Sequence, residues 1–185
     1  MSLRTAPPRG AALTERLTMN VRWILLPLCL APPLAAQTPC ETPDHRAFDF
    51  WVGEWEVYRL GTETLAGTNR IESTLDGCVL HETYATPTGY QGESFSIFDA
   101  GRGVWHQSWV DNGGLLLRIE GGVHDGAMVL EGTTTGPDGA ETLNRITWSR
   151  LDEGGDRVRQ HWETSTDGGA TWTTAFDGEY RRMGG

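Results

Sequence analysis

The chain contains no lysine. All 15 basic residues are arginines, against 25 acidic residues, so the net charge is −10 at pH 7. Residues 1–36 hold four of the arginines and one glutamate, which leaves 11 basic and 24 acidic residues after position 36. A surface this acidic repels nucleic acid and anionic membranes. We therefore expect neither of them as a partner.

The chain also lacks an apolar run of the roughly 20 residues that a membrane span needs. Its longest apolar stretch, Trp23–Leu30, comes after Arg16 and Arg22. The run Ala31–Ala36, which consists mainly of small residues, follows it. Positive, apolar and small residues in this order are typical of a secretory signal peptide. We predict a signal peptide over residues 1–36, with Met19 as an alternative start, and export to the periplasm or the extracellular space.

Cysteine is scarce. Loss of the signal peptide would remove Cys29 and leave Cys40 and Cys78. An even pair in an oxidising compartment usually forms a disulfide, so we predict a bond between these two; a pair of buried free thiols is the alternative. Gln37, Thr38 and Pro39 lack the small character expected just before a lipidated cysteine, so we expect a free, soluble product.

No helical periodicity of useful length appears beyond residue 47. Short β-rich runs alternate instead with turns such as Asp111–Gly114 and Thr166–Gly169, whose Asp, Asn and Gly residues suit tight hairpins. Ten such runs joined by short loops predict an antiparallel meander. The expected strands are 48–59, 64–75, 78–85, 90–99, 103–111, 114–121, 126–134, 140–150, 156–165 and 170–182.

Closure into a barrel removes the two exposed edges of a meander. We therefore predict an all-β fold, a single antiparallel up-and-down β-barrel of about ten strands. The barrel domain would cover residues 48–183, after a lead-in over residues 37–47. A two-sheet sandwich is the alternative architecture.

Alternation of side chains along each strand predicts which residues face inward. In the strand at 156–165, for example, Arg157, Arg159 and His161 share the charged face, so Gln160 and Trp162 face inward. The same reasoning places Leu75 and Trp172 inside. The predicted interior combines tryptophans with amides, and its candidate ligand-binding residues are Trp55, Asn69, Trp105, Gln107, Trp109, Asn144, Gln160 and Trp162.

Buried amides must form hydrogen bonds or their burial costs free energy. Four amides inside a small barrel therefore indicate either a polar structural network or a cavity. Aromatic walls with a few convergent polar groups are typical of small-molecule sites. We favour a cavity that holds a small apolar or amphipathic molecule.

The segment Gly53-x-Trp55, on the first expected strand, resembles the Gly-x-Trp signature of lipocalins. In that family the tryptophan closes one end of the barrel and packs against an arginine near the C-terminus. The resemblance implies a cation–π contact of Trp55 with Arg181 or Arg182.

More broadly, residues 37–183 resemble a family of uncharacterised secreted bacterial proteins with lipocalin-like, calycin-type barrels. The matching segments are Phe48–Trp51, Asp76–Leu80, Trp105–Asp111 and the Ser-x-Asp-Gly-Gly hairpin at 165–169. This resemblance implies a fold and a compartment. It carries no reaction and no catalytic residue.

The five histidines show no His-x-x-x-His spacing, and no Cys-x-x-Cys pair is present. We expect no metal and no cofactor. A haem held by one axial histidine is the alternative, and His81 is the histidine whose face the alternation leaves ambiguous.

Glu82 is the candidate acid–base residue, provided that Leu80, Glu82 and Tyr84 face inward. Burial among tryptophans would raise the pKa of its carboxyl group, which suits proton transfer. The alternative is a Glu82 that faces solvent or bonds Arg145. Three functions stay open: a small-molecule binding protein, an isomerase, cyclase or lyase that uses Glu82, and a protein-interaction module with a solid barrel.

Overall fold

The computed structural model describes residues 39–184, so the predicted signal peptide lies outside the described part. Helix α1 (Pro43–Arg46) and a 3-10 helix (Asp49–Trp51) precede ten strands. The strands are β1 (Gly53–Arg59), β2 (Leu65–Thr74), β3 (Val79–Ala85), β4 (Gln91–Asp99), β5 (Val104–Asp111), β6 (Leu116–His124), β7 (Ala127–Thr135), β8 (Glu141–Arg150), β9 (Arg157–Ser165) and β10 (Thr173–Arg182).

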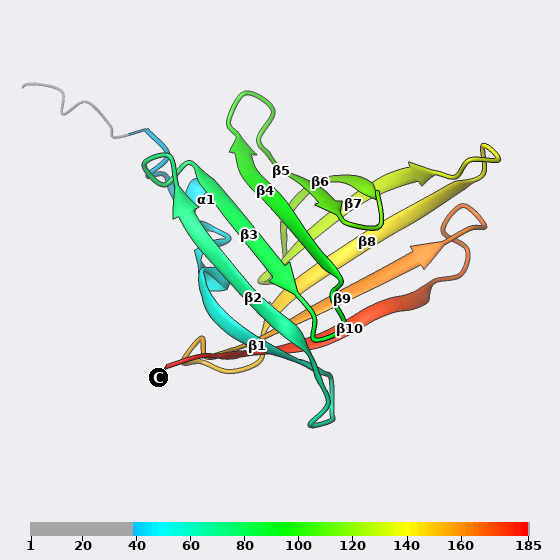
Figure 1. Cartoon of the computed structure of the whole chain (residues 1–185). Coiled ribbons are helices and arrows are strands. Elements are labelled where there is room, and N and C mark those ends of the chain that lie inside the picture. The colour runs from blue at the N-terminus through cyan, green and yellow to red at the C-terminus, as the bar shows by residue number, and fades with distance from the viewer. Residues whose placement is uncertain (1–38, 185) are drawn as a thin grey trace, which may run out of the picture. The chain divides into compact units, whose positions relative to one another are not determined.

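Each strand pairs antiparallel with its neighbours in sequence, and β1 also pairs with β10, which closes the barrel (Figure 1). This confirms the predicted all-β, up-and-down barrel and excludes the sandwich. No helix among residues 39–184 is long and apolar enough to cross a membrane.

The two ends of the barrel differ. The loops β1–β2, β3–β4, β5–β6, β7–β8 and β9–β10 lie at one end, which we call the mouth. Residues 39–52, which we call the N-terminal plug, lie at the opposite end, near the β2–β3 turn and the C-terminus (Figure 1).

The plug fills its end of the barrel with aromatic rings. Phe48 and Trp51 are fully buried, their ring centroids are 5.0 Å apart, and Phe48 also meets Trp148 edge-on at 5.1 Å. The prediction that the first strand starts at residue 48 is therefore wrong for residues 48–52. Residues three apart share a face only on a helical turn, and the 3-10 helix lets both rings point inward.

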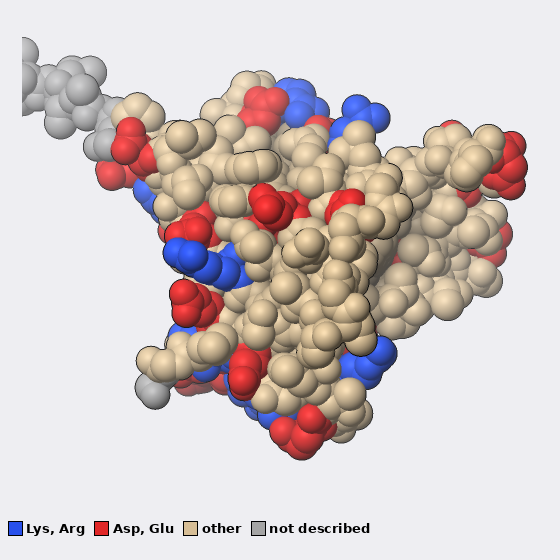
Figure 2. Space-filling model, viewed as in Figure 1, with Lys and Arg blue, Asp and Glu red and all other residues tan. Residues whose placement is uncertain are grey.

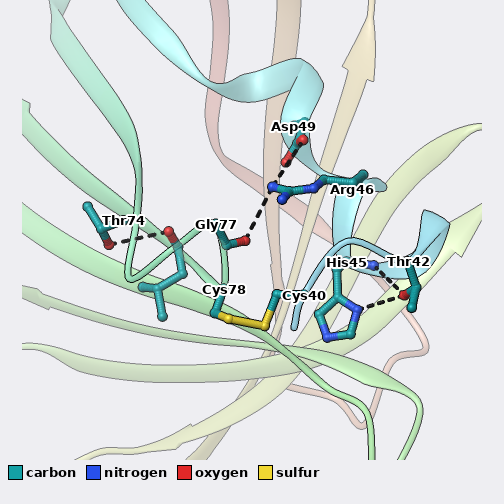
Figure 3. The surroundings of a disulfide bond; sticks show 9 residues. Cys40, Thr42, His45, Arg46, Asp49, Thr74, Gly77 and Cys78 are labelled. Carbon is teal, nitrogen blue, oxygen red and sulfur yellow. Dashed lines mark hydrogen bonds and ion pairs between the residues drawn. A yellow bond between two sulfur atoms is a disulfide. The ribbon is translucent and has the colours of Figure 1, made fainter. Parts of the chain in front are cut away.

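The Cys40–Cys78 disulfide ties the plug to the β2–β3 turn (Figure 3), which confirms the predicted pairing. Beside it, Arg46 donates from Nη1 to the Gly77 carbonyl at 3.4 Å and lies 3.7 Å from Asp49. Because disulfides persist in oxidising compartments, the bond indicates a non-cytoplasmic protein.

Trp55 lies at the plugged end, fully buried, with Arg182 Cζ 4.1 Å from its ring centroid. Arg182 also donates to the Val52 carbonyl at 2.9 Å and so joins the last strand to the plug. A Cβ at Gly53 would lie 2.2 Å from Arg182 Nη1, and the residue has φ +147°. Glycine therefore permits the contact, and the expected tryptophan–arginine pair is confirmed.

The outer surface carries cross-strand ion pairs such as Arg159–Asp177 at 2.7 Å and Arg145–Glu163 at 3.0 Å. Figure 2 shows the same alternation of arginine and acidic side chains on the left of the view, where β1 and β2 lie. Ion pairs on a protein surface typically contribute little individually to the free energy of unfolding.

Two residues expected inside lie elsewhere. Leu75 is 73% exposed because the chain leaves β2 there and turns with a φ of +49°. Trp172 precedes β10 and packs on the outside, with Arg145 Cζ 4.1 Å from its ring centroid. Strand alternation does not extend to residues in turns, so it gave the wrong face for both.

Candidate functional site

The barrel encloses a cavity of about 490 Å³ at its mouth end. Its wall is mainly aromatic and aliphatic, formed by Tyr84, Trp109, Leu117, Ile146, Trp162 and Phe176. Arg59, Leu65 and Tyr90 lie at the rim, close to the mouth loops. The deep part, which we call the floor, consists of Glu82, Gln107, Gln160 and Tyr180.

Strands from different parts of the barrel wall bring these side chains together, because each strand turns alternate residues inward. Gln107 and Trp109 come from β5, and Gln160 and Trp162 come from β9. A Cβ at Gly92 would lie 2.3 Å from the Trp109 ring. The glycine therefore lets this ring approach the backbone of β4 closely.

Glu82 is only 4% exposed, and its partners are neutral. Asn69 Nδ2 donates to Oε1 at 2.7 Å, and Ser94 Oγ donates to Oε2 at 2.6 Å. Burial raises the pKa of Glu82 to about 7, although both donors act to lower it. The open question of its orientation is thus decided: Glu82 faces inward, whereas Arg145 pairs with Glu163 on the outside.

The polar network continues across the floor. Asn69 Nδ2 also donates to Tyr180 Oη at 3.2 Å, and Tyr180 Oη donates to Gln160 Oε1. Burial, with a contribution from the charge of Glu82, raises the pKa of Tyr180 well above its usual value, so this phenol stays protonated. A structural network and a cavity, which the sequence presented as alternatives, therefore coexist.

Two floor groups are available to a ligand. Gln107 Nε2 donates to Ser96 Oγ at 3.0 Å, while Gln107 Oε1 makes no hydrogen bond within residues 39–184. Gln160 Oε1 accepts from Tyr180, while Gln160 Nε2 has no partner in the same part of the chain. Since both residues line the cavity, the floor offers one acceptor and one donor.

The structure divides the eight predicted ligand-binding residues into three groups. Four line the cavity: Gln107, Trp109, Gln160 and Trp162. Asn69 and Asn144 support lining residues, since Asn69 bonds Glu82 and Asn144 Oδ1 accepts from Trp162 Nε1 at 3.0 Å. Trp55 and Trp105 belong to the plugged end, where Trp105 Nε1 donates to the Asp44 carbonyl at 3.1 Å.

Four aromatic lining residues were not predicted for the site: Tyr84, Tyr90, Phe176 and Tyr180. Alternation already placed Phe176 and Tyr180 inside, so they could have been included. Tyr84 depended on the orientation of β3, which Glu82 shares.

No histidine lines the cavity, although all five lie within the described residues. His81 stacks on Phe95 on the outer surface, with ring centroids 4.6 Å apart. The axial histidine of the haem alternative is therefore absent from the cavity lining formed by residues 39–184. Nor does this part of the chain contain a group of three or more side chains that could hold a metal ion.

No protein-family model matches this chain, and no curated protein matches it either. The barrel, its cavity and the chemistry of the lining residues are the features that indicate a function.

Proposed function

We propose that this protein is exported and binds a small, partly apolar molecule in the mouth-end cavity of its lipocalin-like barrel. The main support is the cavity itself, whose volume of about 490 Å³ lies within the range of small-molecule sites. Its aromatic walls suit an apolar body, and its floor suits one polar group. We also propose membership of the secreted lipocalin-like family, on the fold and the motifs quoted above.

The orientation of the ligand follows from the distribution of polarity. The apolar body would pack between Trp109 and Trp162, where burial of apolar area is favourable. The polar end would lie at the floor, where Gln107 Oε1, Gln160 Nε2 and the carboxyl group of Glu82 line the cavity.

Native mass spectrometry of the exported protein, searched for a co-purified small molecule, is the first test. Candidate molecules would then be titrated while tryptophan fluorescence is recorded. Trp109 and Trp162 are the tryptophans of the described chain that line the cavity, so a double Trp109→Phe, Trp162→Phe variant should lose most of the response. Calorimetry should show that this variant still binds, because phenylalanine preserves an aromatic wall.

A Trp172→Phe variant is the matched control, since Trp172 lies on the outer surface. It should keep the full fluorescence response. Equal responses from the double variant and the wild type would place the ligand elsewhere and contradict the proposed site.

Glu82 supports a second candidate function, an isomerase, cyclase or lyase in the same cavity. A buried carboxyl group whose pKa lies near 7 can both take and give a proton at neutral pH. Conversion of a bound molecule by the wild type, abolished in Glu82→Gln while binding persists, would support the enzyme. Unchanged ligand after prolonged incubation would leave the binding function. The open lumen gives no support to a solid interaction module.

A further inference from the structure

We propose that the natural ligand of this cavity is an organic cation, an amine or quaternary ammonium compound whose charge lies beside Glu82 and whose apolar body contacts the aromatic walls. This inference rests on the proposed binding function and names the chemical class of the ligand.

The first argument is the lack of a counter-charge for Glu82. None of the ion pairs among residues 39–184 includes Glu82. A buried carboxylate with no cation beside it is costly. A cationic ligand would supply the missing charge.

The groups that face Glu82 from the surrounding strands are neutral. Asn69 of β2 and Ser94 of β4 donate to it, and the phenols of Tyr84 and Tyr180 have raised pKa values. His81, its neighbour on β3, packs on the outer surface. Arg59 is the basic residue of the cavity lining, and it lies at the rim.

The second argument is the aromatic character of the wall. Tyr84, Trp109, Trp162 and Phe176 line the same cavity as Glu82. Aromatic faces attract cations through their quadrupoles, more strongly when water is excluded, and aromatic cages are a known solution for quaternary ammonium groups. A carboxylate together with several rings favours a cation over a neutral molecule of the same shape.

The third argument is the field of the whole protein. The 11 basic and 24 acidic residues after position 36 give the proposed exported chain a net charge of −13, which raises the local concentration of cations and lowers that of anions. Among the residues that line the cavity, Arg59 at the rim is the basic residue that could pair with an anionic ligand. A fatty acid held there, with its chain in the lumen, is therefore the main competing occupant.

The test compares three probes by calorimetry at pH 8: benzyltrimethylammonium, its neutral isostere neopentylbenzene, and octanoate. We expect benzyltrimethylammonium to bind at least about tenfold more tightly than neopentylbenzene, because shape and apolar area are matched and only the charge differs. Glu82→Gln should remove this preference while neopentylbenzene still binds, which shows that the variant is folded. Glu153→Gln removes the same charge from the exposed β8–β9 loop and should keep the preference.

The pH dependence gives an independent readout, because benzyltrimethylammonium is charged at every pH. The ionised fraction of Glu82 rises from about one tenth at pH 6 to about nine tenths at pH 8, given a pKa of about 7. The affinity for the cation should therefore increase about tenfold over this interval, and that for neopentylbenzene should not change.

Equal affinities for the cation and its isostere, or a preference that survives Glu82→Gln, would overturn the cation proposal and leave the binding function standing. Tightest binding of octanoate, lost in Arg59→Gln, would overturn it in favour of an anion at the rim. Failure of all three probes to bind would count against both the cation proposal and the proposed function.

Discussion

Glu82 should make the stability of the fold depend on pH in an unusual direction. Its pKa is raised from 4.5 to about 7 by burial, so between these values the folded chain holds a proton that the unfolded chain has released. The free energy of unfolding should therefore fall as pH rises through this interval, by about 3 kcal/mol at most. Urea titrations at pH 5 and pH 8 would measure the change.

The comparison with Glu82→Gln isolates this effect from other titrating groups. The variant should lose most of the decrease between pH 5 and pH 8, whereas Glu153→Gln should keep the wild-type decrease. Carboxylates with lowered pKa values, such as Glu120 and Asp167, act in the opposite sense and at lower pH. A wild type that is equally stable at both pH values, or more stable at pH 8, would contradict the assignment.

Trp55 and Trp172 offer a matched pair of substitutions. In both cases an arginine Cζ lies 4.1 Å from the ring centroid, but Trp55 is fully buried at the plugged end and Trp172 packs on the outer surface. Trp55→Ala should lower the free energy of unfolding by about 3–5 kcal/mol, as large aromatic truncations in cores do. Trp172→Ala should cost less than about 1 kcal/mol, since the half-buried ring loses mainly a cation–π contact on the outer surface.

Chemical denaturation of the two variants would measure both costs. Similar losses would mean that the cation–π contact, and not burial, dominates at the barrel end.

Within single strands, the alternation of side chains predicted which residues face the barrel interior. It did not predict how far along the barrel axis each residue lies. It correctly turned Gln107, Trp109, Gln160 and Trp162 inward. Trp105 and Trp109 lie four residues apart on the inner face of β5. Alternation could not predict that Trp105 contacts the plug whereas Trp109 lines the cavity. Depth depends on register and on what fills each end, and both are set by contacts between residues far apart in sequence.

The element that alternation missed is the plug, whose 3-10 helix interrupts the extended chain. Its anchor is the Cys40–Cys78 disulfide, which closes a separation of 38 residues. In the chain-entropy model a loop of this length contributes about 4 kcal/mol.

A Cys40→Ser, Cys78→Ser double variant should be less stable by about that amount in urea denaturation. Reductant should destabilise the wild type similarly and leave the variant unchanged; equal stability of both proteins would show that the plug is held by its aromatic contacts alone.

Over the whole molecule, stability and binding are assigned to opposite ends of the barrel. The plugged end collects fully buried aromatic side chains, among them Phe48, Trp51 and Trp148. The mouth end keeps polar groups without protein partners and an open volume. Tyr180 of the floor joins the two regions, because its ring packs edge-on against Trp51 and Trp55 of the plugged end, with ring centroids 6.3 and 6.2 Å apart.

The cysteines also provide a test of export for the whole chain. The predicted signal peptide contains Cys29, and residues 39–184 contain the bonded pair Cys40 and Cys78. An exported product that begins near Gln37 should therefore react with an alkylating reagent only after reduction. A product that retains residues 1–36 should show one reactive thiol without reductant, since Cys29 would have no partner.

Intact-mass analysis, with and without alkylation, measures both where the protein starts and how many of its thiols react. A mass that includes Met19 in the purified secreted fraction would contradict signal removal, and two reactive thiols in a product that starts near Gln37 would contradict the disulfide while leaving export intact.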